Sequence, residues 1–321
     1  MTLSIPPETA SLVCIGFDGE EPTPFLEEAL HAGVSAVILF SRNVGTPEAT
    51  WTTCNRIREA AGRPILIAVD QEGGSSRRLV DGFTPVPSMR ALAGAGEEAV
   101  REAAITTARE LRSVGFGLDL APVVDVDTNA RNPVIGERSF SGDPVVVARM
   151  ASLWVESMQR HGVAACAKHF PGHGDTSEDS HRELPRLPHD LDRLRMVELP
   201  PFSAAIEAGV AAIMTAHVLF EAIDPTVPAT LSPNVLQGML REELGFEGVV
   251  VSDDLEMEAI AGRMDIGRAA VEAVEAGVDL LLCCHREDRQ RRVLEALASS
   301  LDPARAERAA ARVAGLLAYA T

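Results

Sequence analysis

The sequence has few basic residues: 29 Lys and Arg stand against 47 Asp and Glu, which gives a formal net charge of −18 over 321 residues. Nucleic acids and anionic membranes bind to basic faces, so this balance argues against both as partners. No uncharged apolar run approaches the roughly 20 residues of a transmembrane helix. The N-terminus also lacks a basic segment followed by a long apolar one, so no signal peptide is predicted and we expect a cytoplasmic location.

Cysteines are few, odd in number and spaced unlike any zinc-binding pattern. The five are Cys14, Cys54, Cys166, Cys283 and Cys284. Most lie in apolar, strand-like runs, where a free thiol behaves as a small hydrophobic side chain. Buried free thiols in a reducing compartment are therefore predicted, and a structural zinc site is not.

Short apolar runs alternate with amphipathic stretches along the whole chain. The predicted strands span residues 12–17, 34–40, 64–69, 118–126, 163–170, 211–217, 248–252 and 278–283. The predicted helices span 25–32, 47–61, 97–114, 144–161, 191–208, 234–244, 266–276, 288–299 and 303–320, and a glycine directly follows seven of them. This alternation predicts an α/β fold with a parallel sheet.

Eight such units in a chain of this length fit a closed, TIM-like (β/α)8 barrel. A doubly wound open sheet is the alternative. Its nucleotide-binding form is disfavoured because no GxGxxG follows the first strand and no GxxxxGK[ST] occurs. No linker or change in composition divides the chain, so we expect one catalytic domain over residues 1–321.

Polar residues follow the predicted strands at their carboxyl ends. They are Asp70, Gln71 and Glu72, then Asp125 and Asp127, Lys168 and His169, His217, and Asp253 and Asp254. In a (β/α)8 barrel these strand ends meet on one face, where active sites lie. Acidic residues there can instead cap the following helix, which would account for Asp254 and Asp127 but not for Lys168, His169 or His217. The sequence therefore predicts a functional rim.

A rim of carboxylates, Lys, Arg and His is suited to binding a polyhydroxylated ligand, because carboxylates accept hydrogen bonds from hydroxyls and the cations donate them. Glycoside hydrolysis further needs a carboxylate nucleophile and a separate acid/base. Asp253 follows a β-branched run and is placed for the first role. For the second, His173 and His181 are candidates, because imidazole titrates near neutrality, and Asp179 could pair with His181.

A metal site is the competing interpretation of these His and Asp residues. His169, His173 and His181 fall on a strand end and a loop rather than on one helix face, so their spacing is a weak metal signal. Neither a metal nor a cofactor is expected.

At these residues the chain resembles the single-domain β-N-acetylglucosaminidases of glycoside hydrolase family 3, the NagZ type. The motifs that carry the resemblance are KHFPGHG at 168–174, DSH at 179–181, SDDLEM at 252–257, DQEGG at 70–74, IGERSF at 135–140 and FSRN at 40–43. One departure lies after the DQEGG motif, where the family often has an Arg directly and this chain has Ser75, Ser76, Arg77 and Arg78.

The resemblance implies a TIM-like barrel and a retaining, two-step mechanism. Asp253 would be the nucleophile, and His181 the acid/base, assisted by Asp179. The implied sugar-binding residues are Asp70, Arg78, Arg138, Lys168 and His169.

Under this resemblance the substrate is a terminal β-GlcNAc on a murein fragment or a chitooligosaccharide. The alternatives are a β-GlcNAc phosphorylase, a β-glucosidase and an inactive sugar-binding protein. The last would have lost the nucleophile or the dyad, and both are intact. The sequence does not fix the oligomeric state, and a monomer is favoured.

Overall fold

Eight parallel strands close into a barrel in the computed structural model, which describes residues 3–180 and 182–319. Around the barrel the order is β1-β12-β11-β9-β7-β6-β3-β2. The strands are β1 (Val13–Ile15), β2 (Ala36–Leu39), β3 (Leu66–Val69), β6 (Leu118–Asp119), β7 (Ala164–Phe170), β9 (Ala212–Thr215), β11 (Val249–Asp254) and β12 (Leu280–Cys283). The predicted (β/α)8 barrel is confirmed, and closure excludes the open sheet.

The strands are short and almost uniformly apolar. β2 reads AVIL, β3 reads LIAV and β12 reads LLLC, and every residue in these strands is buried. Strands covered on both faces need such runs rather than alternating polarity. Neighbouring strands pair residue by residue, as Ala36 does with Leu66 and Leu39 with Val69. All five cysteines are buried and free, as predicted.

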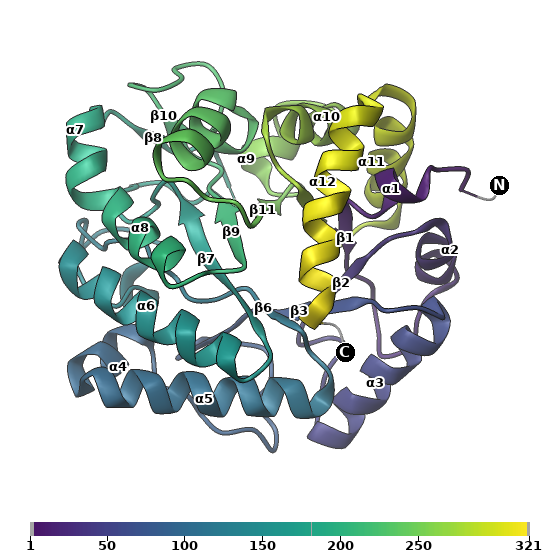
Figure 1. Ribbon diagram of the computed structural model, residues 1–321, viewed down its shortest axis with the longest axis horizontal. Helices are drawn as coiled ribbons and strands as arrows, with labels where there is room; N and C mark the ends of the chain where they lie inside the picture. Colours follow the sequence, from purple (N-terminus) through teal and green to yellow (C-terminus); the bar gives the residue numbers. More distant parts are fainter. Residues whose placement is uncertain (1–2, 181, 320–321) are drawn as a thin grey trace.

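Helices surround the strands (Figure 1). The α-helices are α1 (Pro7–Ala10), α2 (Pro24–Ala32), α3 (Pro47–Ala61), α4 (Met89–Ala95), α5 (Glu97–Val114), α6 (Pro144–Arg160), α7 (Leu191–Arg193), α8 (Leu199–Glu207), α9 (Glu258–Ala261), α10 (Ile266–Ala276), α11 (Glu287–Ser300) and α12 (Pro303–Leu316). The remaining helical segments are η1 (Gly136–Arg138), η2 (Leu194–Glu198), η3 (Ala229–Leu231), η4 (Asn234–Glu243) and η5 (Leu317–Tyr319), of which η2 and η4 are π-helical.

Local sequence sets where several helices begin and end. Thr23, Thr46, Asp143 and Asp302 each cap a helix through a side-chain oxygen that accepts a backbone N–H, and a proline occupies the first helical position. At the other end, Gly115 closes α5 with φ +106°, and a Cβ there would lie 2.6 Å from Nη1 of Arg58. Only glycine fits such a stop.

Two predicted elements are interrupted in the structure, and the helices α1, α4 and α9 lie outside the predicted ones. The expected helix 191–208 is divided into α7, the π-helical η2 and α8. The expected strand 118–126 keeps regular pairing only in β6, with one isolated bridge from Val123 to Lys168 farther on. Pro122 accounts for the second departure, because it cannot donate to the ladder.

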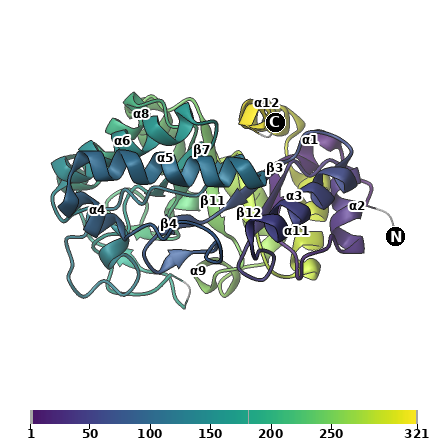
Figure 2. The same cartoon turned by 90° about the horizontal axis from the view of Figure 1, so that it is seen from below.

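The elements that follow barrel strands β3 and β11 lie on one side of the barrel. After β3 comes a small antiparallel hairpin, β4 (Gln71–Gly73) and β5 (Ser76–Arg77). After β11 comes α9. Figure 2 shows β4 and α9 on the lower side, away from α12 and the C-terminus. A further small pairing joins β8 (Arg186–Leu187) to β10 (Leu219–Phe220).

Candidate active site

A cavity of about 500 Å³ opens at the carboxyl ends of the barrel strands. Six of the eight predicted site residues line it: Asp70, Arg78, Arg138, Lys168, His169 and Asp253. They come from the ends of β3, β7 and β11, from the chain just after β5 and from η1. The parallel strands thus bring part of the predicted rim into one concave site, and its members Gln71, Asp125, Asp127 and His217 do not line the cavity.

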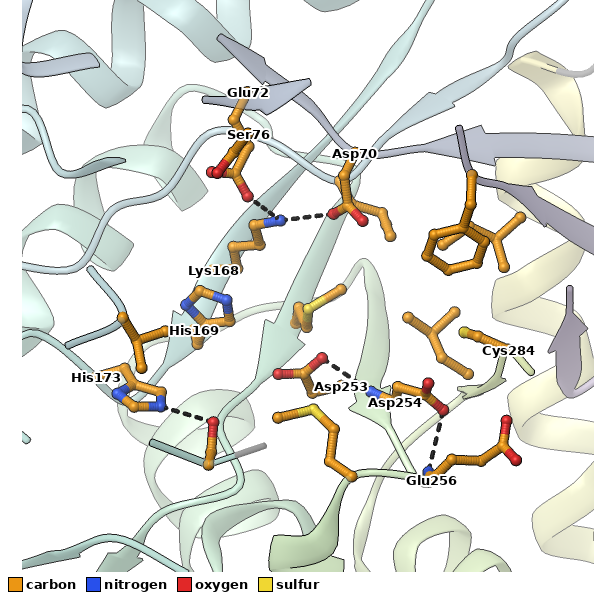
Figure 3. A pocket seen from close by; sticks show the side chains of 18 of the residues that line it. Asp70, Glu72, Ser76, Lys168, His169, His173, Asp253, Asp254, Glu256 and Cys284 are labelled. Carbon is orange, nitrogen blue, oxygen red and sulfur yellow. Dashed lines mark hydrogen bonds and ion pairs between the residues drawn. The ribbon is translucent and has the colours of Figure 1, made fainter. Parts of the chain in front are cut away.

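Lys168 lies at the centre of a buried ion cluster. Its Nζ is 2.8 Å from Oδ1 of Asp70 and 2.7 Å from Oε1 of Glu72 (Figure 3). Arg138 holds Glu72 by two parallel hydrogen bonds, Nε to Oε2 at 2.7 Å and Nη2 to Oε1 at 2.8 Å. Only 2% of Lys168 and 3% of Glu72 are exposed. This geometry fixes the side chains of Arg138 and Glu72, because two parallel hydrogen bonds allow only one relative orientation.

The charges in this cluster stabilise one another. Burial raises the pKa of Glu72, but the charges of Lys168 and Arg138 and the hydrogen bonds from them together lower it by more, so the pKa lies well below its usual range. Burial likewise lowers the pKa of Lys168, and Asp70 and Glu72 raise it above its usual range. Both groups are therefore charged at neutral pH, and Lys168 presents donors into the cavity.

The β4–β5 hairpin positions Arg78. The Gln71 side chain spans the hairpin, because its Oε1 accepts the backbone N–H groups of Arg78 and Leu79 and its Nε2 donates to the Leu79 carbonyl. Arg78 then reaches Asp70, with Nη2 3.4 Å from Oδ2, and its guanidinium lies 5.8 Å from the centre of the Phe40 ring. Arg78, rather than its neighbour Arg77, lines the cavity.

Asp253 lies in β11, opposite Lys168 across the cavity (Figure 3). Its Oδ1 accepts the N–H of Asp254 at 2.8 Å. Burial raises the pKa of Asp253, but His217, His169, the Asp254 N–H and Lys168 together hold it below the ordinary value. Asp253 is thus a rigidly placed, ionised carboxylate.

His217, two residues after the end of β9, supports the chain at Asp253 and Asp254. Its Nε2 donates to the Asp254 carbonyl at 3.1 Å, and its Nδ1 lies 2.8 Å from the Thr230 hydroxyl. Burial lowers the pKa of this imidazole. His217 is therefore a neutral ring whose two nitrogens are both used within the protein.

Asp125 fixes the orientation of the His169 ring. The Nδ1 atom of His169 lies 2.7 Å from Oδ2 of Asp125, whose Oδ1 accepts the backbone N–H groups of His169 and His173. Burial raises the pKa of Asp125, and the charge of His169 and the hydrogen bond from it lower it below its ordinary value. An ionised carboxylate on Nδ1 leaves Nε2 of His169 for a ligand.

The loop after β7 holds the remaining predicted residues. Asp179 lies on this loop, is 29% exposed in its side chain and is 3.8 Å from Nε of Arg182. It is not among the residues that line the cavity. His181, the predicted acid/base, lies outside the described residues.

His173, the other acid/base candidate, does not fit that role. It is 1% exposed, and both ring nitrogens are bound, Nδ1 to Thr176 and Nε2 to Ser180. Burial and the neighbouring His169 lower its pKa to about 4. A buried, neutral imidazole whose two nitrogens are both hydrogen-bonded within the protein is not placed to exchange a proton with a substrate near neutral pH.

Glu72 was expected on the rim but was given no role there, and the structure gives it two cationic partners, Lys168 and Arg138. Its signal was its place in the DQEGG motif two residues after Asp70. The capping alternative is wrong for both Asp254 and Asp127. Asp254 accepts the N–H of Glu256 and lies 3.2 Å from Nε2 of His285, while Asp127 pairs with Arg90 at 2.7 Å.

Within residues 3–180 and 182–319, no three His, Cys, Asp or Glu side chains are arranged to hold a metal ion. Among the carboxylates of the cavity, Asp70 and Glu72 are paired with Lys168 and Arg side chains, and Asp254 with His285. In the same part of the chain, no helix is both long and apolar enough to cross a membrane.

Asp119, at the end of β6, gives a pH-dependent prediction. It is fully buried, its Oδ1 accepts the Gln71 N–H at 2.9 Å, and its Oδ2 has no hydrogen-bond partner in the described part of the chain. Burial raises its pKa from 3.8 to about 7. A raised pKa favours folding at pH below 3.8, and this contribution is lost as the pH rises through 7.

Asp119→Asn keeps the Oδ1 acceptor and removes the charge. We expect its free energy of unfolding to exceed that of the wild type by on the order of 2–4 kcal/mol above pH 7, with little difference near pH 4. Urea unfolding across this range measures the difference, with the exposed Asp192→Asn as control. A difference that is independent of pH would contradict the assignment.

Comparison with known proteins gives a consistent picture. Residues 14–316 match the glycosyl hydrolase family 3 N terminal domain. A β-hexosaminidase of Idiomarina loihiensis is 39% identical over 280 residues, which cover 86% of this chain and 84% of that protein. A β-hexosaminidase of Methylococcus capsulatus is 42% identical over 272 residues, covering 83% and 80%.

Solved structures share the barrel. A glycoside hydrolase family 3 β-N-acetylglucosaminidase from Paenibacillus sp. superposes with a TM-score of 0.96 at 43% identity; the match covers 99% of this chain, which spans only 63% of that one. NagZ from Neisseria gonorrhoeae, solved in complex with N-trifluoroacetyl-D-glucosamine, gives a TM-score of 0.82 at 33% identity and covers 95% of this chain and 98% of its own.

Proposed function

The chain belongs to glycosyl hydrolase family 3, and we propose that it is a retaining exo-β-N-acetylglucosaminidase. Its substrates carry a terminal, non-reducing β-GlcNAc on a murein fragment or a chitooligosaccharide. The observation that carries the proposal is the ionised Asp253 facing the Lys168–Asp70 pair across one cavity. The names and structures of the relatives support the same activity.

The wall opposite Asp253 suits the hydroxyl groups of a sugar. Lys168 and Arg138 offer N–H donors, and Asp70 offers carboxylate oxygens as acceptors. These side chains already hold one another, so little order has to be gained when the sugar binds. We assign Asp70, Arg78, Arg138, Lys168 and His169 to this sugar-binding wall.

Asp253 acts as the nucleophile in the first step. Its carboxylate oxygen attacks the anomeric carbon, a bond forms between them, and the bond from that carbon to the glycosidic oxygen breaks. His181 gives a proton to the departing oxygen. In the second step His181, now neutral, takes a proton from water, whose oxygen attacks the anomeric carbon and releases Asp253.

Asp179 assists His181 in this proposal. A carboxylate two residues away can fix the imidazole tautomer and raise its basicity. A neutral imidazole also repels an incoming anion less than a carboxylate would, so phosphate is an alternative acceptor for the second step.

The proposal includes a single catalytic domain over residues 1–321 and a cytoplasmic location. Five free, buried cysteines support a reducing compartment. Within it, murein turnover is the process that supplies such substrates.

Kinetics with aryl glycosides test the activity. We expect the wild-type protein to hydrolyse aryl β-GlcNAc with a kcat/KM roughly tenfold or more above that for the matching aryl β-glucoside, because a site that binds a polar group rejects the analogue lacking it. Products are identified with and without phosphate. A preference for the glucoside would contradict the proposal, and GlcNAc 1-phosphate as the main product would convert it to phosphorolysis.

A further inference from the structure

The loop from His173 to Ser180 is anchored to the barrel where it begins. The backbone N–H of His173 donates to Oδ1 of Asp125 at 2.7 Å, and Nδ2 of Asn132 donates to the His173 carbonyl at 2.8 Å. Gly174 packs so closely on the chain after β6 that a Cβ there would overlap the carbonyl oxygen of Val126. The first residues of the loop, His173 and Gly174, are therefore held in place against the barrel.

The His173 ring spans the loop and reaches its far end. Nδ1 lies 2.7 Å from the Thr176 hydroxyl, and Nε2 lies 3.0 Å from the Ser180 hydroxyl. Figure 3 shows the second contact as a dashed line from His173. His173 and Ser180 are both buried, although both line the cavity. One side chain thus joins the first and last residues of this loop.

One arrangement of protons satisfies both contacts of the ring together with the contact of the Thr176 hydroxyl. The Thr176 hydroxyl lies 3.1 Å from the His173 carbonyl, which can only accept, so the hydroxyl proton points there. Nδ1 then donates to Thr176, and Nε2 of the neutral ring accepts the proton of the Ser180 hydroxyl. Burial of the ring, which disfavours the imidazolium form, keeps this arrangement over the neutral pH range.

Ser180 has a second anchor on the opposite side. Its carbonyl accepts the N–H of Ala259 in α9 at 3.3 Å. α9 follows closely on β11, the strand that carries Asp253. Ser180 is therefore held between the loop, through His173, and the segment that follows the nucleophile.

We propose that Ser180 and His173 are positioning residues that set the place of residue 181, the next residue in the chain, relative to Asp253. This inference deepens the proposed function and rests on it, because His181 is the acid/base there. A hydroxyl at position 180 would then matter to proton transfer without touching the reacting atoms. Misplacing a general acid by about 1 Å can cost up to 100-fold in rate.

The leaving group separates this role from two others. If Ser180 contacted the sugar, its loss would lower kcat/KM equally for all aryl β-GlcNAc substrates. If it served only stability, the melting temperature would fall and kinetics below it would not change. A positioning role predicts a loss confined to substrates whose leaving group needs a proton.

The experiment compares Ser180→Ala, Ser180→Thr and the matched control Ser177→Ala. Ser177 is an exposed serine of the same loop, 3.4 Å from Asn129, and among the described residues it forms no hydrogen bond with His173. Each protein is assayed with phenyl β-GlcNAc and with 2,4-dinitrophenyl β-GlcNAc, which leaves without a proton. We expect Ser180→Ala to lose roughly tenfold in kcat/KM on the phenyl substrate and under about twofold on the other.

Ser180→Thr, which keeps the hydroxyl, should recover most of the loss, and Ser177→Ala should match the wild type. Equal effects of Ser180→Ala on both substrates, or none on either, would overturn the inference. If Ser180→Ala does not fold, Ser180→Cys keeps the volume with a weaker donor and is judged by the same ratio. A wild type inactive on both substrates would instead refute the proposed function.

Discussion

Asp253→Ala is expected to lose at least roughly 10⁴-fold in kcat on aryl β-GlcNAc, because removal of a nucleophile removes the covalent route itself. Asp253→Asn should be equally inactive although it keeps the shape and the acceptor for the Asp254 N–H. The pair of variants therefore separates the charge of the carboxylate from its structural hydrogen bond. Initial rates with a dinitrophenyl substrate measure the effect without dependence on the acid.

The control for Asp253 is an exposed carboxylate on the far side of the barrel. Glu307 lies on the outer face of α12, and Glu307→Ala should retain full activity. All three variants should keep the melting temperature within a few degrees of wild type. Turnover above about one hundredth of the wild-type rate in folded Asp253→Ala would exclude Asp253 as the nucleophile.

The rim of the barrel could be predicted from sequence because strand order and strand polarity act together. Apolar runs that end in Asp70, Lys168 and Asp253 recur at regular spacing, and a parallel barrel brings all such ends to one face. That these strand ends lie close together can be predicted from the barrel alone, without knowing how the side chains pack. The closed barrel and the cavity positions of Asp70, Lys168, His169 and Asp253 follow from this one regularity, whereas Arg78 and Arg138 were expected only from the family resemblance.

The sequence did not reveal which side chains form hydrogen bonds and ion pairs with one another in the folded protein. Glu72 lies in a three-residue strand, too short for a periodic signal, and its pairing with Lys168 joins residues 96 positions apart. His173 looked available because it lies on a glycine-rich loop. In the structure Asp125 binds its backbone N–H, and Thr176 and Ser180 bind its ring nitrogens; this convergence of partners is a tertiary property.

For Asp254 and Asp127 the sequence suggested a local role, helix capping, that the structure does not show. A carboxylate between a strand and a helix is a common cap, and local sequence offers no reason to reject it. In the structure His285 and Arg90, both distant in sequence, take these carboxylates. Long-range ion pairs therefore override local capping preference at this rim.

His181→Ala is expected to separate the two steps of the reaction. A dinitrophenyl group leaves without a proton, so Asp253 should still be glycosylated. Attack by water would lack its general base and slow by roughly 10²–10³-fold. The covalent intermediate should therefore accumulate. With a phenyl leaving group the first step should fail instead, and no intermediate should build up.

Intact-protein mass spectrometry of His181→Ala, mixed with 2,4-dinitrophenyl β-GlcNAc and quenched in acid, tests this central claim most directly. The account predicts an added mass of one N-acetylglucosaminyl unit, which proteolysis locates on the peptide that contains Asp253 and which Asp253→Asn abolishes. Substrate turnover with no adduct at any time, or an adduct on another residue, would contradict it.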